Sequence, residues 1–537
     1  MRRLVVSVLC CAAVLGCGGK NKNAGPNLEA LGFAPELRLE PGDVIIANGR
    51  VIDGTGEPAR EADVWLRGDR IMAVTELGDM FPAIVSVIDA QGKVVAPGFI
   101  DTHAHGDPLT HPEMQSFLAQ GVTTILLGQD GNSVPVAELE QWFNEMEQKG
   151  IGVNVATTLG HGTLRDESGI GLSPSPTAEQ LAALEAMCER GLQLGALGLS
   201  TGLEYQPGTF SRMEELEAVA RPVGKRGLMV MSHVRSEDDD KLRESLNELV
   251  EQCRRTGARA HVSHLKSVYG KGAARAEEIL GYLQQARGTG VTVTADLYPY
   301  TASYTGIGLL FPDYALPPND YTTVAEQKRN ELLDYLDRRV ARRNGPEATL
   351  FGSGKYAGKT LAQVAEEQGR PYAEVLLEAG PDSGSAAYFI MDEELQARLL
   401  VDPAVNICSD GSPTMRHPRG HGSFARVIRK FVVDEERLTL EQAIHKMSGL
   451  SAQHVGLDAL DRGTLTPGSY ADVVIFDPNM VEDTATYTSP FQLAKGFDTI
   501  FVNGVLIRQN GEFSAERMGR ALRRSDSDSL QGASPSP

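Results

Sequence analysis

Eight short apolar segments recur along the middle of the chain, and helical patterns separate most of them. The segments are 99–105, 123–128, 153–160, 196–202, 228–234, 260–265, 291–298 and 405–410. Repeated strand–helix units predict a parallel sheet, and eight of them predict an α/β fold closed into a (β/α)8 TIM barrel, with its working residues at the carboxyl ends of the strands. An open, doubly wound sheet is the alternative, but no Gly-x-Gly-x-x-Gly follows the first segment.

The two ends of the chain carry a different pattern, in which short apolar runs alternate with turn signals. This pattern fills 43–97 and returns in 463–520. We expect one small β-sandwich-like domain built from both regions, and two unrelated hairpin regions are the alternative. The Ser-, Asp- and Pro-rich residues 521–537 predict a disordered tail.

The barrel itself is expected over 98–462, with one anomalous connection. An insert of about 312–404 separates the seventh and eighth strands and contains helical patterns at 324–343 and at about 361–378. Long insertions after barrel strands tend to be lids or binding loops.

The N-terminus has the pattern of a secretory signal. Arg2 and Arg3 precede an apolar run that is too short to span a bilayer, and the following Leu15-Gly16-Cys17 resembles a bacterial lipobox. We expect a lipoprotein signal peptide over 1–16, a lipid anchor at Cys17 and a flexible tether over 17–42. An ordinary signal peptide or a membrane-buried helix is the alternative. Because Gly rather than Asp follows Cys17, we expect a protein of the bacterial cell envelope at the outer membrane, facing the periplasm.

The net charge and the cysteine count limit which partners and which covalent cross-links can be expected. The net charge of −20 argues against nucleic acid, which would need a basic patch. Membrane contact is expected only through the lipid anchor. Three cysteines remain after the signal and the lipidated residue, an odd and widely spaced set that implies no disulfide framework: Cys188, Cys253 and Cys408.

Polar side chains follow most of the predicted strands. His103 and His105 lie two residues apart, so both imidazoles point to one side and could hold a divalent metal. Other strand ends supply Asp130, His233, His264 and Asp410. One such histidine alone is more often structural, but strand ends of a barrel converge on one rim. The joint set predicts a Zn²⁺-type centre of one or two ions.

Such a centre would give the chain a hydrolytic chemistry. A bound metal lowers the pKa of water toward neutrality, which yields hydroxide, and it polarises a carbonyl oxygen. The carboxylate of Asp410 could take the proton of that water and pass it to a leaving nitrogen. Asp410 is therefore the candidate general base and acid.

Eight motifs in a fixed order carry a resemblance to a known family. They are PGFIDTHAH (97–105), GHGTLR (160–165), GLSTGLEY (198–205), SHVRSE (232–237), SHLK (263–266), DLYPY (296–300), SDG (409–411) and HPR (417–419). The chain resembles the N-acyl-D-amino-acid deacylase (D-aminoacylase) family of the amidohydrolase superfamily over about 43–520. The resemblance implies hydrolysis of a small-molecule N-acyl-D-amino acid to a carboxylate and a free D-amino acid.

The resemblance also implies roles for single residues. Positions matching His233 and His264 hold a tightly bound zinc ion, and those matching His103 and His105 belong to a second, variably occupied site. The resemblance assigns the base and acid role to Asp410. Three further positions are implied to bind the substrate, the first two at its α-carboxylate: Lys266, Arg419 and, less directly, Tyr298.

One position departs from the family pattern. Many members carry Gly-Asn-Cys-Gly after the second strand, and that Cys ligates zinc, whereas this chain has Gly128-Gln129-Asp130-Gly131. A carboxylate can ligate zinc and can bridge two ions, and it is a harder ligand than a thiolate, so another divalent metal is conceivable. A binuclear site becomes more plausible, and the alternative is that Asp130 ligates nothing.

Other functions stay open at this stage. A dipeptidase acting on D-residues or a cyclic-amide hydrolase of the same superfamily is the first alternative, but Lys266 and Arg419 favour a free α-carboxylate beside the scissile amide. A non-catalytic surface-binding lipoprotein is the second, since fold does not imply function. The intact set of candidate ligands argues against it. His161 and Arg165 either order a rim loop or touch the substrate.

Overall fold

The computed structural model describes residues 38–78 and 81–525. The expected signal peptide, the lipidated Cys17, residues 17–37 of the tether and residues 526–537 of the tail lie outside this part. Within the described residues, no helix is both long enough and apolar enough to cross a membrane. Cys188, Cys253 and Cys408 are free and buried.

Eight parallel strands form the predicted barrel when β8 and β9 are counted as one interrupted strand. They are β6 (Phe99–Asp101), β7 (Val122–Leu127), β8 (Asn154–Thr157), β9 (Leu159–Gly160), β10 (Gly198–Gly202), β11 (Met229–His233), β12 (Arg259–Val262), β13 (Val293–Leu297) and β17 (Val405–Ile407). Thr158 divides the third strand, so β8 pairs with β7 and β9 pairs with β10. The N–H of Asp410 donates to the carbonyl of His103 at 2.8 Å, which joins the last strand end to the first.

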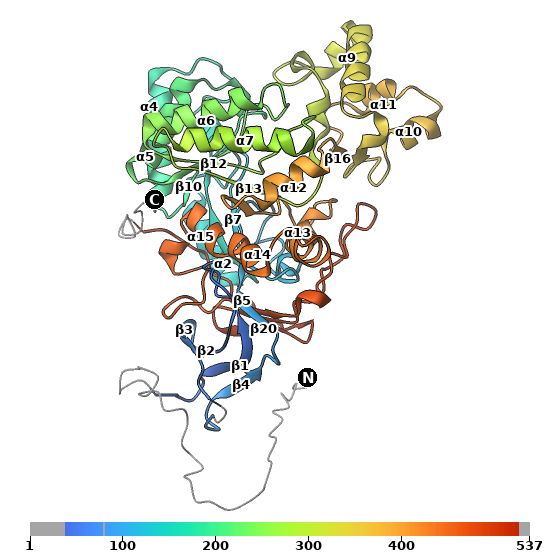
Figure 1. The fold of residues 1–537 in the computed structure, drawn as a ribbon. Helices are drawn as coiled ribbons and strands as arrows, with labels where there is room; N and C mark the ends of the chain where they lie inside the picture. The colour runs from blue at the N-terminus through green and yellow to red at the C-terminus, as the bar shows by residue number, and fades with distance from the viewer. Residues whose placement is uncertain (1–37, 79–80, 526–537) are drawn as a thin grey trace, which may run out of the picture.

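Amphipathic helices cover the strands (Figure 1). They are α2 (Leu139–Lys149), α4 (Ala178–Gln193), α5 (Met213–Lys225), α6 (Leu242–Thr256), α7 (Gly272–Arg287), α12 (Glu393–Val401), α14 (Leu440–Met447) and α15 (Gly449–Val455). Shorter helices are α1 (Gln115–Leu118), α3 (His161–Glu167) and α13 (Arg419–Arg426), the last continuing into a π-helical segment, Val427–Asp434. The start of α4 is fixed by a capping box in which Thr177 and Gln180 bond each other's backbone N–H.

The insert has different limits from the expected 312–404. It begins at β14 (Ala302–Gly306), which pairs antiparallel with β16 (Ser385–Phe389), and β15 (Thr349–Phe351) pairs with the other edge of β16. This small sheet takes up the chain almost as soon as β13 ends. At the other limit, α12 packs against α7 and belongs to the barrel wall. The insert lies beside the mouth of the barrel, in yellow in Figure 1.

Both helices expected in the insert are split. The pattern over 324–343 forms α8 (Tyr321–Gln327) and α9 (Arg329–Arg342), and the pattern near 361–378 forms α10 (Leu361–Gln368) and α11 (Tyr372–Ala379). Gly369 ends α10 in a left-handed conformation with φ 61°, and Pro371 follows. Glycine at this position terminates a helix, and proline lacks the N–H needed to continue it.

One nine-stranded sheet joins the two ends of the chain below the barrel. Its strands are β1 (Val44–Val51), β2 (Arg60–Arg67), β3 (Arg70–Thr75), β4 (Ser86–Asp89), β5 (Val94–Pro97), β18 (Val473–Phe476), β19 (Thr499–Val502), β20 (Val505–Gln509) and β21 (Glu512–Phe513). The antiparallel pair β5–β18 joins the N-terminal and C-terminal parts. Alternate residues separate two cores: Val95 and Ile475 pack within the small domain, whereas Val94 and Phe476 pack against the barrel.

Residues 521–525, which were expected to belong to the disordered tail, instead contact the barrel. Leu522 donates its N–H to the carbonyl of Val155 at 2.8 Å, and Arg524 donates to Gly195 at 3.1 Å. Leu522 is buried in an apolar cluster with residues of the barrel strands. Residues 521–525 are thus ordered beside β8, because the apolar side chain of Leu522 in this polar segment packs against the barrel strands.

Candidate metal centre

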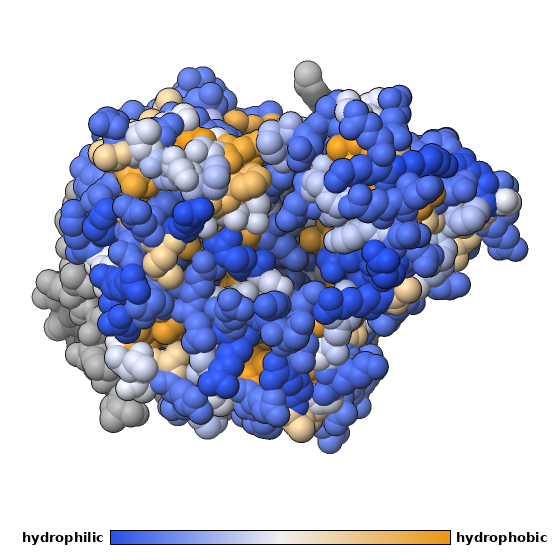
Figure 2. All heavy atoms as spheres, turned by 90° about the horizontal axis from the view of Figure 1, so that it is seen from above, coloured by the Kyte–Doolittle hydropathy of each residue, from blue (hydrophilic) through white to orange (hydrophobic). Residues whose placement is uncertain are grey.

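A cavity of about 610 Å³ opens at the carboxyl ends of the barrel strands. Seen from above, the surface is hollowed between the barrel and the insert, and its rim is largely hydrophilic (Figure 2). Of the nine residues predicted for the site, eight line this cavity: His105, Asp130, His233, His264, Lys266, Tyr298, Asp410 and Arg419. His103 lies directly beneath them and is fully buried.

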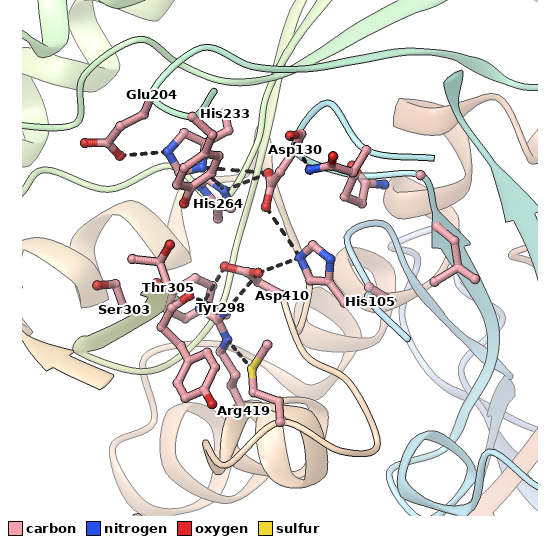
Figure 3. A pocket seen from close by; sticks show the side chains of 18 of the residues that line it. His105, Asp130, Glu204, His233, His264, Tyr298, Ser303, Thr305, Asp410 and Arg419 are labelled. Carbon is pink, nitrogen blue, oxygen red and sulfur yellow. Dashed lines mark hydrogen bonds and ion pairs between the residues drawn. The ribbon is translucent and has the colours of Figure 1, made fainter. Parts of the chain in front are cut away.

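The first group of candidate ligands comes from the first, second and eighth strand ends. The Nε2 atom of His105 lies 3.1 Å from Oδ1 of Asp410 and 3.5 Å from Oδ2 of Asp130 (Figure 3). His103 places its Nε2 3.4 Å from Oδ1 of Asp130. Among the described residues, neither ring nitrogen of His103 has a hydrogen-bond partner. Buried polar atoms are normally paired, so these orphaned nitrogens fit a metal ligand.

The second group shares Asp130 with the first. Nε2 of His264 and Nδ1 of His233 lie 3.3 and 3.7 Å from the same Oδ1 of Asp130, and only 3.0 Å from each other. The ligand atoms of each group lie within 4.8 Å of one another. Two adjoining sets of imidazole nitrogens around one carboxylate fit a pair of metal ions with Asp130 between them.

Three of the candidate ligands have a left-handed backbone. The φ angles are 53° at Asp130, 37° at His264 and 49° at Asp410, each just after a barrel strand. Non-glycine residues adopt this region at an energetic cost, and such strain clusters at functional sites. The strand ends therefore turn sharply at the positions where these side chains enter the cavity.

Two carboxylates outside the predicted set of site residues complete the site. Oε2 of Glu204 lies 2.9 Å from Nε2 of His233, and Oε1 of Glu237 lies 3.2 Å from Nδ1 of His264. Both contact the ring nitrogen that faces away from Asp130, the arrangement by which a carboxylate orients a metal-binding imidazole. Their signal was present in the sequence, since each follows a strand end in a recognised motif.

The electrostatics of the site favour a cation. Burial alone would lower the pKa of His105, but Asp130 and Asp410 outweigh it and raise this pKa to about 9. Burial likewise opposes the ionised form of Asp410, but Arg419 and the hydrogen bond from His105 hold the pKa of its carboxyl well below the usual range. The negative field that favours a proton on His105 equally attracts a divalent ion.

The predicted substrate-binding residues form a cluster beside the ligands. Nζ of Lys266 lies 2.6 Å from Glu237, and the guanidinium of Arg419 makes a two-pronged ion pair with Asp410 at 2.8 and 2.9 Å. The ring of Tyr298 lies 5.7 Å from Nζ of Lys266 and 4.8 Å from Cζ of Arg419. Both cations thus already have a carboxylate partner. The buried Tyr298 hydroxyl has no hydrogen-bond partner among the described residues.

His161 and Arg165 do not line the cavity. Both contact Glu215, His161 at 2.8 Å and Arg165 at 2.6 and 2.7 Å, and all three side chains are buried. Of the two interpretations left open by the sequence, the structure favours the one in which they order the rim.

Comparison with known proteins places this geometry in a family. Residues 324–490 match the model of the amidohydrolase family. N-acyl-D-glutamate deacylase of Alcaligenes xylosoxydans xylosoxydans is 34% identical, over 90% of this chain and 96% of its own. The chain belongs to the N-acyl-D-amino-acid deacylase family of amidohydrolases. D-aminoacylase of the same organism is another relative, 33% identical over 90% of this chain and 98% of its own.

A solved structure of another family member has a similar fold. N-acyl-D-glutamate deacylase of Bordetella bronchiseptica superposes with a TM-score of 0.76 at 33% identity, covering 90% of this chain and 100% of that one. That deacylase was crystallised with zinc and a phosphonate inhibitor that mimics the tetrahedral intermediate. The barrel fold and the family predicted from the sequence are thereby confirmed.

Proposed function

We propose that this protein hydrolyses the amide bond of N-acyl-D-amino acids and releases a carboxylate and a free D-amino acid. The observation that carries the proposal is the pair of ligand groups sharing Asp130, with the ionised Asp410 facing the same cavity. The relatives at 33–34% identity are named for this reaction on D-glutamate and D-amino acids.

The chain's own residues would hold one or two zinc ions. His233, His264 and Asp130 form one set of ligands, and His103, His105, Asp130 and Asp410 form the other. The orphaned nitrogens of His103 and the sharing of Asp130 fit this assignment. When bound, zinc acts as a Lewis acid toward the amide carbonyl and lowers the pKa of water.

Asp410 is the residue that would carry a proton from the attacking water to the leaving nitrogen. Its carboxylate stays ionised beside Arg419 and His105, so it can accept a proton from the attacking water. The water oxygen forms a bond to the acyl carbon, the carbon–nitrogen bond breaks, and Asp410 delivers the proton to the leaving nitrogen. Atoms and charges balance without any further reactant.

The α-carboxylate of the substrate would lie against Tyr298, Lys266 and Arg419. The Tyr298 hydroxyl, which has no partner within the described part of the chain, would donate a hydrogen bond to the substrate, and the two cations would contribute charge while sharing their carboxylate partners. A cyclic-amide substrate would leave this cluster without an anion, and no feature of the cavity specifically favours a dipeptide.

The test is release of amine from matched N-acetyl-D- and N-acetyl-L-amino acids. We expect D-selective turnover that Asp410→Asn lowers by about 10³-fold or more, as for loss of a general base acting in the transition state. Asp434→Asn, which changes an exposed acid paired with Arg429, is the matched control and should keep wild-type rates. Turnover that survives in Asp410→Asn would overturn the assignment of the base.

We also propose that the mature protein is anchored by lipid at Cys17 on the periplasmic side of the outer membrane. Support comes from the apolar run and from Leu15-Gly16-Cys17. In a bacterial host, the wild-type protein should fractionate with outer membranes, and Cys17→Ser should abolish lipid labelling. An unlabelled wild-type protein in the soluble periplasm would contradict the anchor.

A further inference from the structure

Arg343 brings a charged side chain from the insert to the wall of the active-site cavity. It follows the last residue of α9, where its N–H bonds the carbonyl of Val340 at 2.9 Å. The neighbouring Asn344 donates from Nδ2 to the carbonyl of Phe389 on β16 at 2.8 Å. The guanidinium lies 4.9 Å from the ring centre of Tyr388. Backbone, neighbour and aromatic ring together fix where this side chain lies.

This buried guanidinium has no acceptor. Arg343 is only 2% exposed, yet within residues 38–78 and 81–525 it makes no ion pair and no side-chain hydrogen bond, and its Nε is buried without a partner. A buried charge that lacks a partner is strongly destabilising, so folded proteins normally pair it. The missing acceptor is thus a group that binds in the cavity.

The other cations of the cavity differ in this respect. Lys266 has Glu237 and Arg419 has Asp410 as a partner. The carboxylate of Asp238 also lines the cavity and interacts electrostatically with Arg343, but no ion pair within 4.0 Å joins the two. Asp238 lies closer to two other guanidinium groups, Arg339 at 3.9 Å and Arg342 at 3.5 Å, so its single negative charge is shared among three arginines. Positive charge is therefore in excess in the part of the cavity that Arg343 lines.

We propose that Arg343 binds a second carboxylate of the substrate, the one on the side chain of an acidic D-amino acid. This inference rests on the proposed deacylase activity and specifies its substrate class: N-acyl derivatives of D-aspartate or D-glutamate. The guanidinium fork matches a carboxylate in a two-pronged contact. The α-carboxylate is left to the separate cluster around Tyr298.

A carboxylate on the acyl group is the other source of the same chemistry. Apolar side chains line both parts of the cavity, and Leu309 and Ile390 lie on the insert side. The part formed by the segments after β6 and β7, the end of β7 and α2 carries apolar side chains suited to an acyl chain and no basic residue: Pro108, Leu127, Val134 and Trp142. Arg343 comes from the insert, together with the wall that carries Ser303 and Thr305. We therefore assign it to the amino-acid side chain.

The wild-type enzyme tests the proposal without any mutation. N-acetyl-D-glutamate should exceed its uncharged isostere N-acetyl-D-glutamine in kcat/KM by about 30-fold or more, the effect expected when a buried charge loses its partner. N-succinyl-D-glutamine, which carries its extra carboxylate on the acyl group, should gain nothing over N-acetyl-D-glutamine. Equal values for the first pair, or a gain from the succinyl group alone, would overturn the assignment.

Variants then attribute the preference to Arg343. Arg343→Met should lower the ratio of kcat/KM between N-acetyl-D-glutamate and N-acetyl-D-glutamine by about 30-fold, chiefly through KM, and Arg343→Lys should restore part of it. Arg338→Met, at an exposed arginine of α9 that does not line the cavity, should keep the wild-type ratio. An unchanged ratio in folded Arg343→Met refutes the inference. If the wild-type enzyme deacylates D-substrates without preference for acidic ones, only the role of Arg343 fails; if it deacylates none, the proposed function fails.

Discussion

The backbone N–H of His264 donates to Oδ1 of Asp296 at 2.5 Å. Oδ2 of the same carboxylate lies 2.8 Å from Oγ1 of Thr102 and 3.1 Å from Nε2 of His261. Asp296 is fully buried beneath the candidate metal ligands. It therefore holds the strained turn at His264, whose φ is 37°, and so fixes where this imidazole enters the cavity.

Replacing Asp296 should weaken metal binding. We expect Asp296→Asn to lower zinc affinity by about 10- to 100-fold, because it removes a charged partner behind a metal-binding residue. Zinc content after dialysis at fixed free zinc measures the effect. Thr294→Val, two residues earlier on β13 and bonded to His261 rather than to a ligand, should keep its zinc. Wild-type zinc affinity in folded Asp296→Asn would show that the turn at His264 does not need this contact.

Asp130 should determine how many ions the protein holds. Asn tolerates the left-handed backbone at this position, so Asp130→Asn should fold while losing the shared negative charge. We expect fewer zinc equivalents per chain and a lower kcat, measured by elemental analysis and amine release. Asp130→Cys, which introduces the thiolate that the family resemblance implies at this position, should retain one tight ion. Unchanged metal content and rate in Asp130→Asn would rule out Asp130 as a ligand.

The Tyr298 hydroxyl should matter for the substrate and not for the fold. It has no partner among the described side chains, so Tyr298→Phe removes no hydrogen bond within that part of the protein. Thermal stability should stay at the wild-type value, whereas KM should rise about 5-fold for the loss of one hydrogen bond of about 1 kcal/mol. A fall in Tm without a change in KM would instead indicate a structural role.

Glu215 should stabilise the rim in a pH-dependent way. Burial alone would raise the pKa of its carboxyl, but His161 and Arg165 outweigh it, so this pKa lies below the usual 4.5. The stabilisation is therefore complete above pH 4.5 and is lost as the pH falls through the lowered pKa. Glu215→Gln should cost about 3–5 kcal/mol in the free energy of unfolding at neutral pH, as for breaking a buried ion pair.

Denaturant unfolding across a pH series measures this effect. The difference between wild type and Glu215→Gln should be constant near neutral pH and should narrow in acid. The adjacent, exposed Glu214 offers the control Glu214→Gln, which should change stability little at any pH. A difference that grows in acid would mean that the carboxylate is not the stabilising form.

The barrel and most of the site could be predicted because each rests on local sequence. Eight apolar segments predicted the strands, and several strand ends carried a candidate ligand such as His233 or Asp410. The insert limits could not be read this way, because β14 has the composition of a loop and its partners on β16 lie far along the chain. Helix splitting at Gly369 was visible in principle but was masked by continuous apolar periodicity.

Contacts between distant segments account for the remaining differences. The pairing of Arg419 with Asp410 depends on how α13 approaches the eighth strand end, which no spacing encodes. Glu204 and Glu237 follow strand ends, but the sequence does not say which imidazole nitrogen each one meets. Arg343 lay within an anomalous insert, and only its burial without an acceptor on the cavity wall connects it to the substrate.

The most direct test of the account is zinc-dependent release of amine from an N-acetyl-D-amino acid. The protein would be stripped of metal by a chelator and then titrated with zinc while the rate on matched D- and L-substrates is followed. We expect no turnover without metal, and recovery of turnover on the D-substrate as the first one or two equivalents of zinc bind. Full turnover by the metal-free protein, or zinc binding without turnover of either enantiomer, would contradict this expectation.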